Sequence, residues 1–249
     1  MAGRLEGKVA IVTGAGSGFG EGIARRFAQE GASVVVADIN GEAAERVAAD
    51  IGPAARAVRA DVTVMADVRD MCAAAEAFGG LDVLVNNAGY THRNGSMLDI
   101  DEEMFDRILA VNAKAIYLAA LVAVPMLRAR GGGSIINTAS TAGLRPRPGL
   151  TWYNASKGWA ITASKSMAVE LAPDNIRVNA LCPVAGETGM LHLFMGEDTP
   201  EKRAQFQASI PLGRLSRPDD MAGAALWLAS DEAAFITGVA LEVDGGRCV

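Results

Sequence analysis

The chain has 249 residues, 50% of them hydrophobic, and carries a formal net charge of −6 at pH 7. This length is enough for one substantial core, and residues 1–249 are expected to form a single domain. The acidic balance argues against a nucleic-acid partner or an anionic membrane surface. We also expect no signal peptide and no membrane span, because the sequence has no uninterrupted apolar stretch of about 18 residues.

Three cysteines, Cys72, Cys182 and Cys248, lie far apart in the sequence. They form no CxxC pair and no cluster with histidine, so the sequence predicts free thiols and no metal site. Free thiols are typical of a reducing compartment, and we expect a cytoplasmic protein. None of the three cysteines is a good candidate for catalysis.

The first part of the chain has the pattern of a nucleotide-binding unit. A short β-branched run at residues 8–13 leads into a glycine-rich turn and an apolar-periodic helix at 20–30. A second apolar run, residues 33–38, ends at Asp38. This order predicts a dinucleotide site, in which glycines let the backbone approach a pyrophosphate at a helix N-terminus.

Asp38 favours NAD over NADP as the cofactor. A carboxylate at this point accepts hydrogen bonds from the adenosine ribose and repels a 2′-phosphate. Neither arginine nor lysine occupies residues 15–17, Ile39 or Asn40, the positions that would hold such a phosphate. The alternative is a structural role, in which Asp38 only begins the turn at residues 38–41.

The rest of the chain alternates strand and helix patterns, which predicts an α/β fold: a doubly wound parallel sheet of about seven strands with helices on both faces. A helical stretch at 101–128 is expected to bend near Asn112, because a buried amide needs partners. Ser140 follows a strand at its carboxyl end, where open α/β sheets form ligand sites. The other expected strands are 55–62, 81–85, 134–138, 176–181 and 239–243, and the other helices are 40–51, 68–78, 152–171 and one beginning at 216–220.

Tyr153 and Lys157 lie four residues apart in the expected helix 152–171, so their side chains share one face. A free tyrosine, with a pKa of about 10, is a poor acid or base at neutral pH, and a neighbouring ammonium favours its phenolate. Ser140 adds a hydroxyl that can hold the same substrate oxygen. Together the three side chains predict a proton-transfer site at a developing alkoxide.

The motifs follow one another in a set order. Residues 13–20 read TGAGSGFG, residues 86–89 read NNAG, and Asn112, Ser140 and the Tyr153-x-x-x-Lys157 pair come later. This set resembles the short-chain dehydrogenase/reductase family, and the resemblance covers essentially the whole chain. It implies a single-domain Rossmann fold, a nicotinamide cofactor and a homotetramer.

The resemblance also implies roles for individual residues. Tyr153 is expected to be the acid/base and Ser140 to hold the substrate oxygen. Lys157 is expected to bind the nicotinamide ribose and lower the pKa of Tyr153, and Asn112 to hold a water in a proton relay. The residues expected to bind or stabilise the cofactor site are Gly14, Ser17, Gly18, Phe19, Gly20, Asp38, Ile39, Asp61, Val62, Asn87, Ala88, Gly89, Tyr153, Lys157, Pro183, Gly186 and Thr188.

After the sixth expected strand the sequence departs from the family pattern. The family has a glycine after Pro183, and this chain has Val184, so the backbone must follow an extended path there. Thr188 remains in register for the nicotinamide amide. Residues 189–215 are expected to form a lid over the substrate. Packing against a neighbouring subunit is the alternative.

Candidates for substrate contact come from three segments: the residues after the NNAG turn, the loop between Ser140 and Tyr153, and the lid. They are His92, Leu144, Leu191, Phe194 and Met195. The loop also contains Arg145 and Arg147, either of which can bind an anionic substrate group. Solvent exposure or an ion pair between subunits is the alternative for these arginines. His192 is expected to face solvent.

The predicted function is reversible hydride transfer between NAD and a small-molecule secondary alcohol or ketone. One alternative is an NADPH-dependent 3-oxoacyl-carrier-protein reductase, against which Asp38 and the acidic balance count. A second is a cofactor-binding regulator without turnover, which has little reason to keep all four residues Asn112, Ser140, Tyr153 and Lys157. A third is a sugar epimerase or dehydratase, for which the chain is short.

Overall fold

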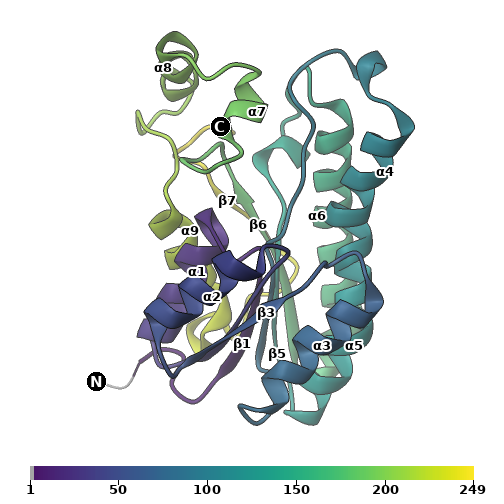
Figure 1. Cartoon of the computed structure of the whole chain (residues 1–249), viewed down its shortest axis with the longest axis vertical. Coiled ribbons are helices and arrows are strands. Elements are labelled where there is room, and N and C mark those ends of the chain that lie inside the picture. Colours follow the sequence, from purple (N-terminus) through teal and green to yellow (C-terminus); the bar gives the residue numbers. More distant parts are fainter. Residues whose placement is uncertain (1–2) are drawn as a thin grey trace.

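A sheet of seven parallel strands runs through the centre of the computed structural model, in the order β3-β2-β1-β4-β5-β6-β7. The structure describes residues 3–249, so the first two residues of the expected domain lie outside it. Helices cover both faces of the sheet (Figure 1). The predicted doubly wound α/β fold is therefore confirmed.

The strands are short apolar runs that fit a sheet buried on both faces. In β1 every residue is buried, and successive side chains enter opposite layers: Ala10 and Val12 pack on one face, Val9 and Ile11 on the other. The strands are β1 Val9–Thr13, β2 Ser33–Asp38, β3 Ala55–Arg59, β4 Val83–Asn86, β5 Gly133–Thr138, β6 Ile176–Pro183 and β7 Ala240–Val243.

Two layers of helices enclose the sheet. The layer of α1, α2 and α9 packs on one face, and the layer of α3, α5 and α6 packs on the other (Figure 1). The helices are α1 Gly18–Gln29, α2 Gly41–Ile51, α3 Met65–Glu76, α4 Glu102–Leu109, α5 Ala115–Ala129, α6 Thr151–Leu171, α7 Leu191–Met195, α8 Pro200–Ala208 and α9 Pro218–Ala229.

The site lies where the strand order reverses. After β1 the chain proceeds outward to β2 and β3, and it then returns to β4 on the other side of β1. Loops at the carboxyl ends of β1 and β4 therefore diverge and leave a crevice, which is where open α/β sheets bind ligands. The helices α7 and α8 lie at the top of the view in Figure 1, above β6 and β7.

The expected bend near Asn112 is a π-helical turn. Residues Ala110–Lys114 form this turn between α4 and α5. Such turns arise where an extra residue is inserted into a helix, and they are frequent at functional sites. Here the turn directs the Asn112 amide inward, where it is buried.

The stretch Glu102–Ala129 is the one described segment long and apolar enough to cross a membrane by length and composition, with a mean hydropathy of 1.9. Within it, Leu118, Ala123 and Leu127 are buried against the sheet. The helix is thus a core element of the α/β fold, and apolar core helices commonly have this composition.

Candidate active site

The glycine-rich turn after β1 is locked to the turn after β4. The Asn87 side-chain amide donates to the carbonyl oxygens of Thr13 and Gly14, at 2.9 and 3.2 Å, and the Thr13 hydroxyl accepts from the Asn87 amide nitrogen at 3.0 Å. A Cβ on Gly20 would lie 2.2 Å from the Gly14 carbonyl oxygen. Gly20 therefore permits the close packing of helix α1 on this turn.

The same turn has the shape that a pyrophosphate needs. Gly14 and Gly18 have φ angles of 62° and 57°, which only glycine adopts readily. Their backbone leads into the N-terminus of α1, where free amides and the helix dipole favour an anion. These residues fit the pyrophosphate of a dinucleotide.

Asp38 stands at the end of β2 beside this turn. Its carboxylate accepts hydrogen bonds from the Gly16 and Asn40 amides, both at 2.9 Å. An arginine from α2, Arg46, approaches the same place and donates to the Gly16 carbonyl oxygen at 2.9 Å. No sequence motif marks Arg46. Its guanidinium is also paired with Glu21, at 3.0 Å.

One cleft of about 470 Å³ joins the glycine-rich turn to the catalytic helix α6. Every residue expected to bind the cofactor lines it, with the exception of Gly20, which is a packing residue. Ser140, Tyr153 and Lys157 line it as well. The cleft also includes Tyr90 and Arg107, which sequence reasoning missed; the Arg107 guanidinium lies 4.4 Å from the Tyr90 ring centroid.

Tyr153 is the acid/base candidate, and its environment holds the proton strongly. Burial raises the pKa of Tyr153 to about 12, while a hydrogen bond with the Ser140 side chain and the charge of Arg147 oppose this rise. Ser140 is held by the Ala142 amide, which donates to its hydroxyl at 3.1 Å. The two hydroxyls therefore face one point in the cleft, as the sequence predicted.

Lys157 differs from the expectation in one respect. Its ammonium donates to the Thr138 carbonyl oxygen at 2.7 Å and lies 5.8 Å from the Tyr153 ring centroid. Burial lowers the pKa of Lys157 to about 8, and Lys157 is not among the groups that shift the pKa of Tyr153. The positive charge that does lower this pKa belongs to Arg147.

Asn112 anchors the backbone rather than lining the main cleft. Its amide exchanges two hydrogen bonds of 2.8 Å with the backbone of Tyr90 and donates to the Ser156 hydroxyl at 2.9 Å. A second cavity, of about 10 Å³, is lined by Asn112, Thr138 and Lys157 among others. This volume is close to the minimum for one water molecule. The expected water relay stays a prediction.

Val184 does not use the left-handed backbone region that a glycine would permit. Asn175 is the only non-glycine residue with a positive φ within residues 3–249, so Val184 avoids that region. Its side chain is buried in a cluster with four residues of the following segment, namely Leu191, Met195, Ile210 and Leu215. The residue that replaces the family glycine thus anchors the base of the lid.

The lid supplies fewer cleft residues than expected. Phe194 lines the cleft and packs on Tyr153, with ring centroids 5.2 Å apart. Leu191 and Met195, on the other side of the short helix α7, are buried in the cluster around Val184 and do not line it. The structure therefore does not bring these two predicted contact residues to the cleft, because their side chains pack at the base of the lid.

Two further substrate candidates are also absent from the cleft lining. His92 is buried, and its Nδ1 lies 2.8 Å from the Arg93 carbonyl oxygen. Leu144 is 38% exposed and does not line the cleft. His192 is exposed, as expected.

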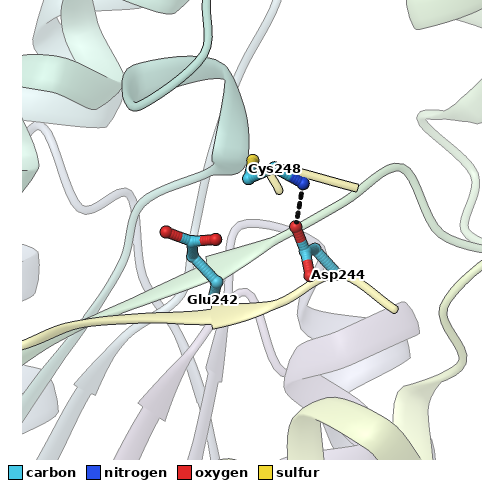
Figure 2. A group of neighbouring side chains, drawn as sticks. All are labelled: Glu242, Asp244 and Cys248. Atoms are coloured by element: carbon cyan, nitrogen blue, oxygen red, sulfur yellow. Dashed lines mark hydrogen bonds between the residues drawn. The ribbon is translucent and has the colours of Figure 1, made fainter. Parts of the chain in front are cut away.

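The cysteines lie outside the catalytic arrangement. All three are free, and burial raises the pKa of Cys72 and of Cys182 to about 12, which keeps both thiols protonated. Cys248 lies near Glu242 and Asp244 (Figure 2). The Asp244 carboxylate accepts hydrogen bonds from backbone amides of the C-terminal turn, including the Cys248 amide at 2.8 Å. The expectation of no metal site stays a prediction.

Fold and cleft together define a nucleotide-dependent oxidoreductase of the Rossmann type. A family model described as enoyl-(acyl carrier protein) reductase matches residues 14–247. The chain is 51% identical to 4-formylbenzenesulfonate dehydrogenase of Comamonas testosteroni, with 98% of each chain covered. It is 41% identical to galactitol 2-dehydrogenase of Agrobacterium fabrum, again with 98% of each covered.

A solved structure is similar over nearly the whole chain. The crystal structure of a 3-ketoacyl-(acyl-carrier-protein) reductase from Brucella melitensis, complexed with NADH, has a TM-score of 0.94 and 51% identity, and covers 98% of this chain and 100% of its own. The chain therefore belongs to the short-chain dehydrogenase/reductase family. It is an oxidoreductase that acts on CH–OH groups of secondary alcohols.

Proposed function

We propose that the chain uses NAD, and not NADP, to interconvert a secondary alcohol and its ketone. The observation that carries this proposal is the position of Asp38, whose carboxylate lines the cleft beside the glycine-rich turn. A 2′-phosphate at this point would meet a negative charge. Arg46 is the nearby cation, and Glu21 already neutralises it at 3.0 Å.

The chain's own residues account for proton transfer. In the oxidation direction Tyr153 accepts the proton of the substrate hydroxyl while Ser140 holds the oxygen. The nicotinamide, when bound, supplies the acceptor for the carbinol hydride. Lys157 would hold the nicotinamide ribose. Arg147 is the charge that lowers the pKa of Tyr153, and the Lys157 ammonium, 5.8 Å from the Tyr153 ring centroid, would add its attraction for the phenolate that reduction leaves behind. The apolar ring of Phe194 covers Tyr153 and excludes water from it.

The second candidate is a 3-oxoacyl-carrier-protein reductase, because a structural relative carries that name. That relative is complexed with NADH, which agrees with a nicotinamide cofactor lacking the 2′-phosphate. A carrier protein is acidic, and this chain has a net charge of −6, so long-range attraction would not assist docking. A regulator without turnover has less support, since Ser140, Tyr153 and Lys157 all lie in one cleft.

The assembly is proposed by family resemblance, and the location is proposed from the cysteines. We propose a homotetramer, and the exposed apolar residues Tyr117 and Leu121 on α5 and Trp159 and Val169 on α6 support burial of these helices between subunits. Light scattering after gel filtration measures this directly. A cytoplasmic location rests on the three free cysteines.

The experiment that tests the proposed function is a panel of alcohols and ketones, each assayed with NAD(H) and NADP(H) at the nicotinamide absorbance. We expect turnover of secondary alcohols with a preference for NAD of about tenfold or more, since a hydrogen bond to a charged group contributes about 1.5–3 kcal/mol. Equal use of both cofactors would reject the NAD assignment.

A further inference from the structure

The part of the cleft near Tyr153 contains a positive charge with no acidic neighbour. The acidic residues that line the cleft, Asp38 and Asp61, follow β2 and β3 at one edge of the sheet. Ser140 follows β5, which lies beyond β1 and β4. Arg147 lines the cleft as well, and it is near enough to Tyr153 for its charge to lower the pKa of the phenol.

Arg147 is fixed in place by packing and not by a counterion. Its guanidinium carbon lies 4.6 Å from the ring centroid of Phe206 in α8, and its carbonyl oxygen accepts a 2.8 Å hydrogen bond from the Asn154 side chain. The Nη2 atom is buried and has no hydrogen-bond partner. Within residues 3–249, no carboxylate lies within 4.0 Å of this guanidinium.

The ionisable groups around Arg147 do not neutralise it. Burial and the neighbouring charge of Arg247 lower the pKa of Arg147, while Cys248 and Tyr153 act in the opposite direction. The pKa of Cys248 is raised to about 11 and that of Tyr153 to about 12, chiefly by burial, so both are neutral at pH 7. Arg147 is partly buried as a residue, and its buried Nη2 has no partner. Holding such a cation without an anion costs free energy, and a ligand that brings the anion offsets this cost.

A second guanidinium reinforces the positive potential. Arg247 lies in the C-terminal turn, where the Asp244 carboxylate accepts from the Gly246 amide at 2.9 Å and from the Cys248 amide at 2.8 Å. Figure 2 shows the second of these bonds. The Arg247 Nε atom is also buried without a hydrogen-bond partner. The Asp244 carboxylate thus binds backbone amides of the turn and does not pair with Arg247. Two guanidiniums lie near each other, and no ion pair within the described residues involves either of them.

The other cations near the cleft are already engaged. Arg145 is exposed and donates to the Arg247 carbonyl oxygen at 3.0 Å, outside the cleft lining. Arg107 stacks on Tyr90. Lys157 donates to Thr138. Of the two loop arginines considered from the sequence, the structure therefore selects Arg147.

We propose that Arg147 binds an oxyanion, a carboxylate or a sulfonate, that the substrate carries away from its reacting carbon. Guanidinium recognises both groups through paired N–H donors. The apolar side chains of Leu150 and Phe194 line the same cleft, so the substrate class is a small apolar secondary alcohol or ketone with an anionic substituent. This inference rests on the proposed function and names its substrate class.

The test compares ketones that differ only in charge. The substrates are 4-acetylbenzoate, 4-acetylbenzenesulfonate and the neutral 4-acetylbenzamide, reduced with NADH by the wild type and by Arg147→Met, Arg147→Lys and Arg145→Met. The readout is the ratio of kcat/KM for an anionic ketone to that for the neutral one. A ratio within one variant cancels any effect of the Arg147 charge on Tyr153.

We expect a wild-type ratio of about tenfold or more, because charged hydrogen bonds contribute about 1.5–3 kcal/mol. Arg147→Met should bring the ratio to about one, Arg147→Lys should restore part of it, and Arg145→Met should keep the wild-type value. Comparing this ratio for 4-acetylbenzoate with that for 4-acetylbenzenesulfonate shows whether the site prefers a carboxylate or a sulfonate. A wild-type ratio near one, or a ratio that survives in Arg147→Met, overturns the proposal.

A binding measurement separates this proposal from the proposed function. Thermal denaturation is followed with NAD and 4-acetylbenzoate, a pair that cannot react with each other. The ketone should raise the Tm of the wild type and not that of Arg147→Met. The Tm of the variant without ketone should be no lower than that of the wild type, because a partly buried charge without a counterion is gone. No turnover with any ketone would reject the proposed function alone. No Tm shift in the wild type would reject the anion site.

Discussion

Lys157 donates its hydrogen bond to the carbonyl oxygen of Thr138, 2.7 Å away at the end of β5. The bond ties the catalytic helix α6 to the central sheet and fixes the ammonium in a buried position. Burial lowers the pKa of Lys157 from 10.5 to about 8. The Lys157 charge, 5.8 Å from the Tyr153 ring centroid, therefore titrates near the physiological range.

We expect ketone reduction to slow as the pH rises through about 8. Below this pH Lys157 is charged and stabilises the phenolate that Tyr153 becomes on giving up its proton; above it the charge is lost, because the folded pKa is depressed. Alcohol oxidation needs the Tyr153 phenolate beside a charged Lys157. The population of this form rises with pH up to about 8 and then levels off, so kcat/KM for oxidation should do the same. The measurement is kcat/KM in both directions between about pH 6 and pH 10.

Lys157→Ala is the control for this pH dependence. It should react slowly in both directions and lack the decline near pH 8. Wild-type reduction that accelerates through this pH would show that the titration of Lys157 does not govern the step.

Changes at Asp38 should alter cofactor choice in a defined order. Asp38→Ala removes the attraction for the ribose and the repulsion of the 2′-phosphate, and it also frees the Gly16 and Asn40 amides that the carboxylate holds at 2.9 Å. The ratio of kcat/KM for NAD to that for NADP should therefore fall, mainly because kcat/KM for NAD decreases. Asp38→Asn keeps an oxygen acceptor and loses the charge, so it should retain more NAD activity than Asp38→Ala.

Adding Ile39→Arg to Asp38→Ala should carry the balance toward NADP, because Ile39 lines the cleft and is 57% exposed. The measurement is kcat/KM for both cofactors in each variant. If the double variant still prefers NAD tenfold, the 2′-phosphate of NADP does not bind beside residues 38 and 39.

Val184→Gly should loosen the lid. The Val184 side chain is 4% exposed and packs with Leu191 and Met195 of α7. Full burial of a valine side chain contributes about 1.5–3 kcal/mol, so its loss should raise KM about tenfold and speed proteolysis within residues 189–215.

Val184→Ala should give intermediate values, since it keeps part of the contact without the conformational freedom of glycine. If Val184→Gly has the same KM and the same rate of proteolysis as the wild type, contacts other than those of Val184 hold the lid.

Much of the fold was predictable because its signals are local. The strand Ser33–Asp38 was located from its own apolar run, and Gly14 and Asn87 were identified by motifs whose partners are set by the topology. The substrate end was less predictable because distant packing decides it. Helix α7 has five residues, too few for a periodic pattern to tell Phe194 from Leu191. The position of Arg147 depends on Phe206, which lies on a separate helix of the lid.

The most direct test of the catalytic account is Tyr153→Phe, measured both for turnover and for NAD binding. The phenyl ring keeps the packing against Phe194, 5.2 Å between centroids, and removes only the group that carries the proton. General acid–base groups contribute about 10²- to 10⁴-fold, so kcat should fall by at least a hundredfold or so while the Kd for NAD stays within about threefold of the wild type. A variant that retains about a tenth or more of the wild-type kcat would show that Tyr153 is not the acid/base.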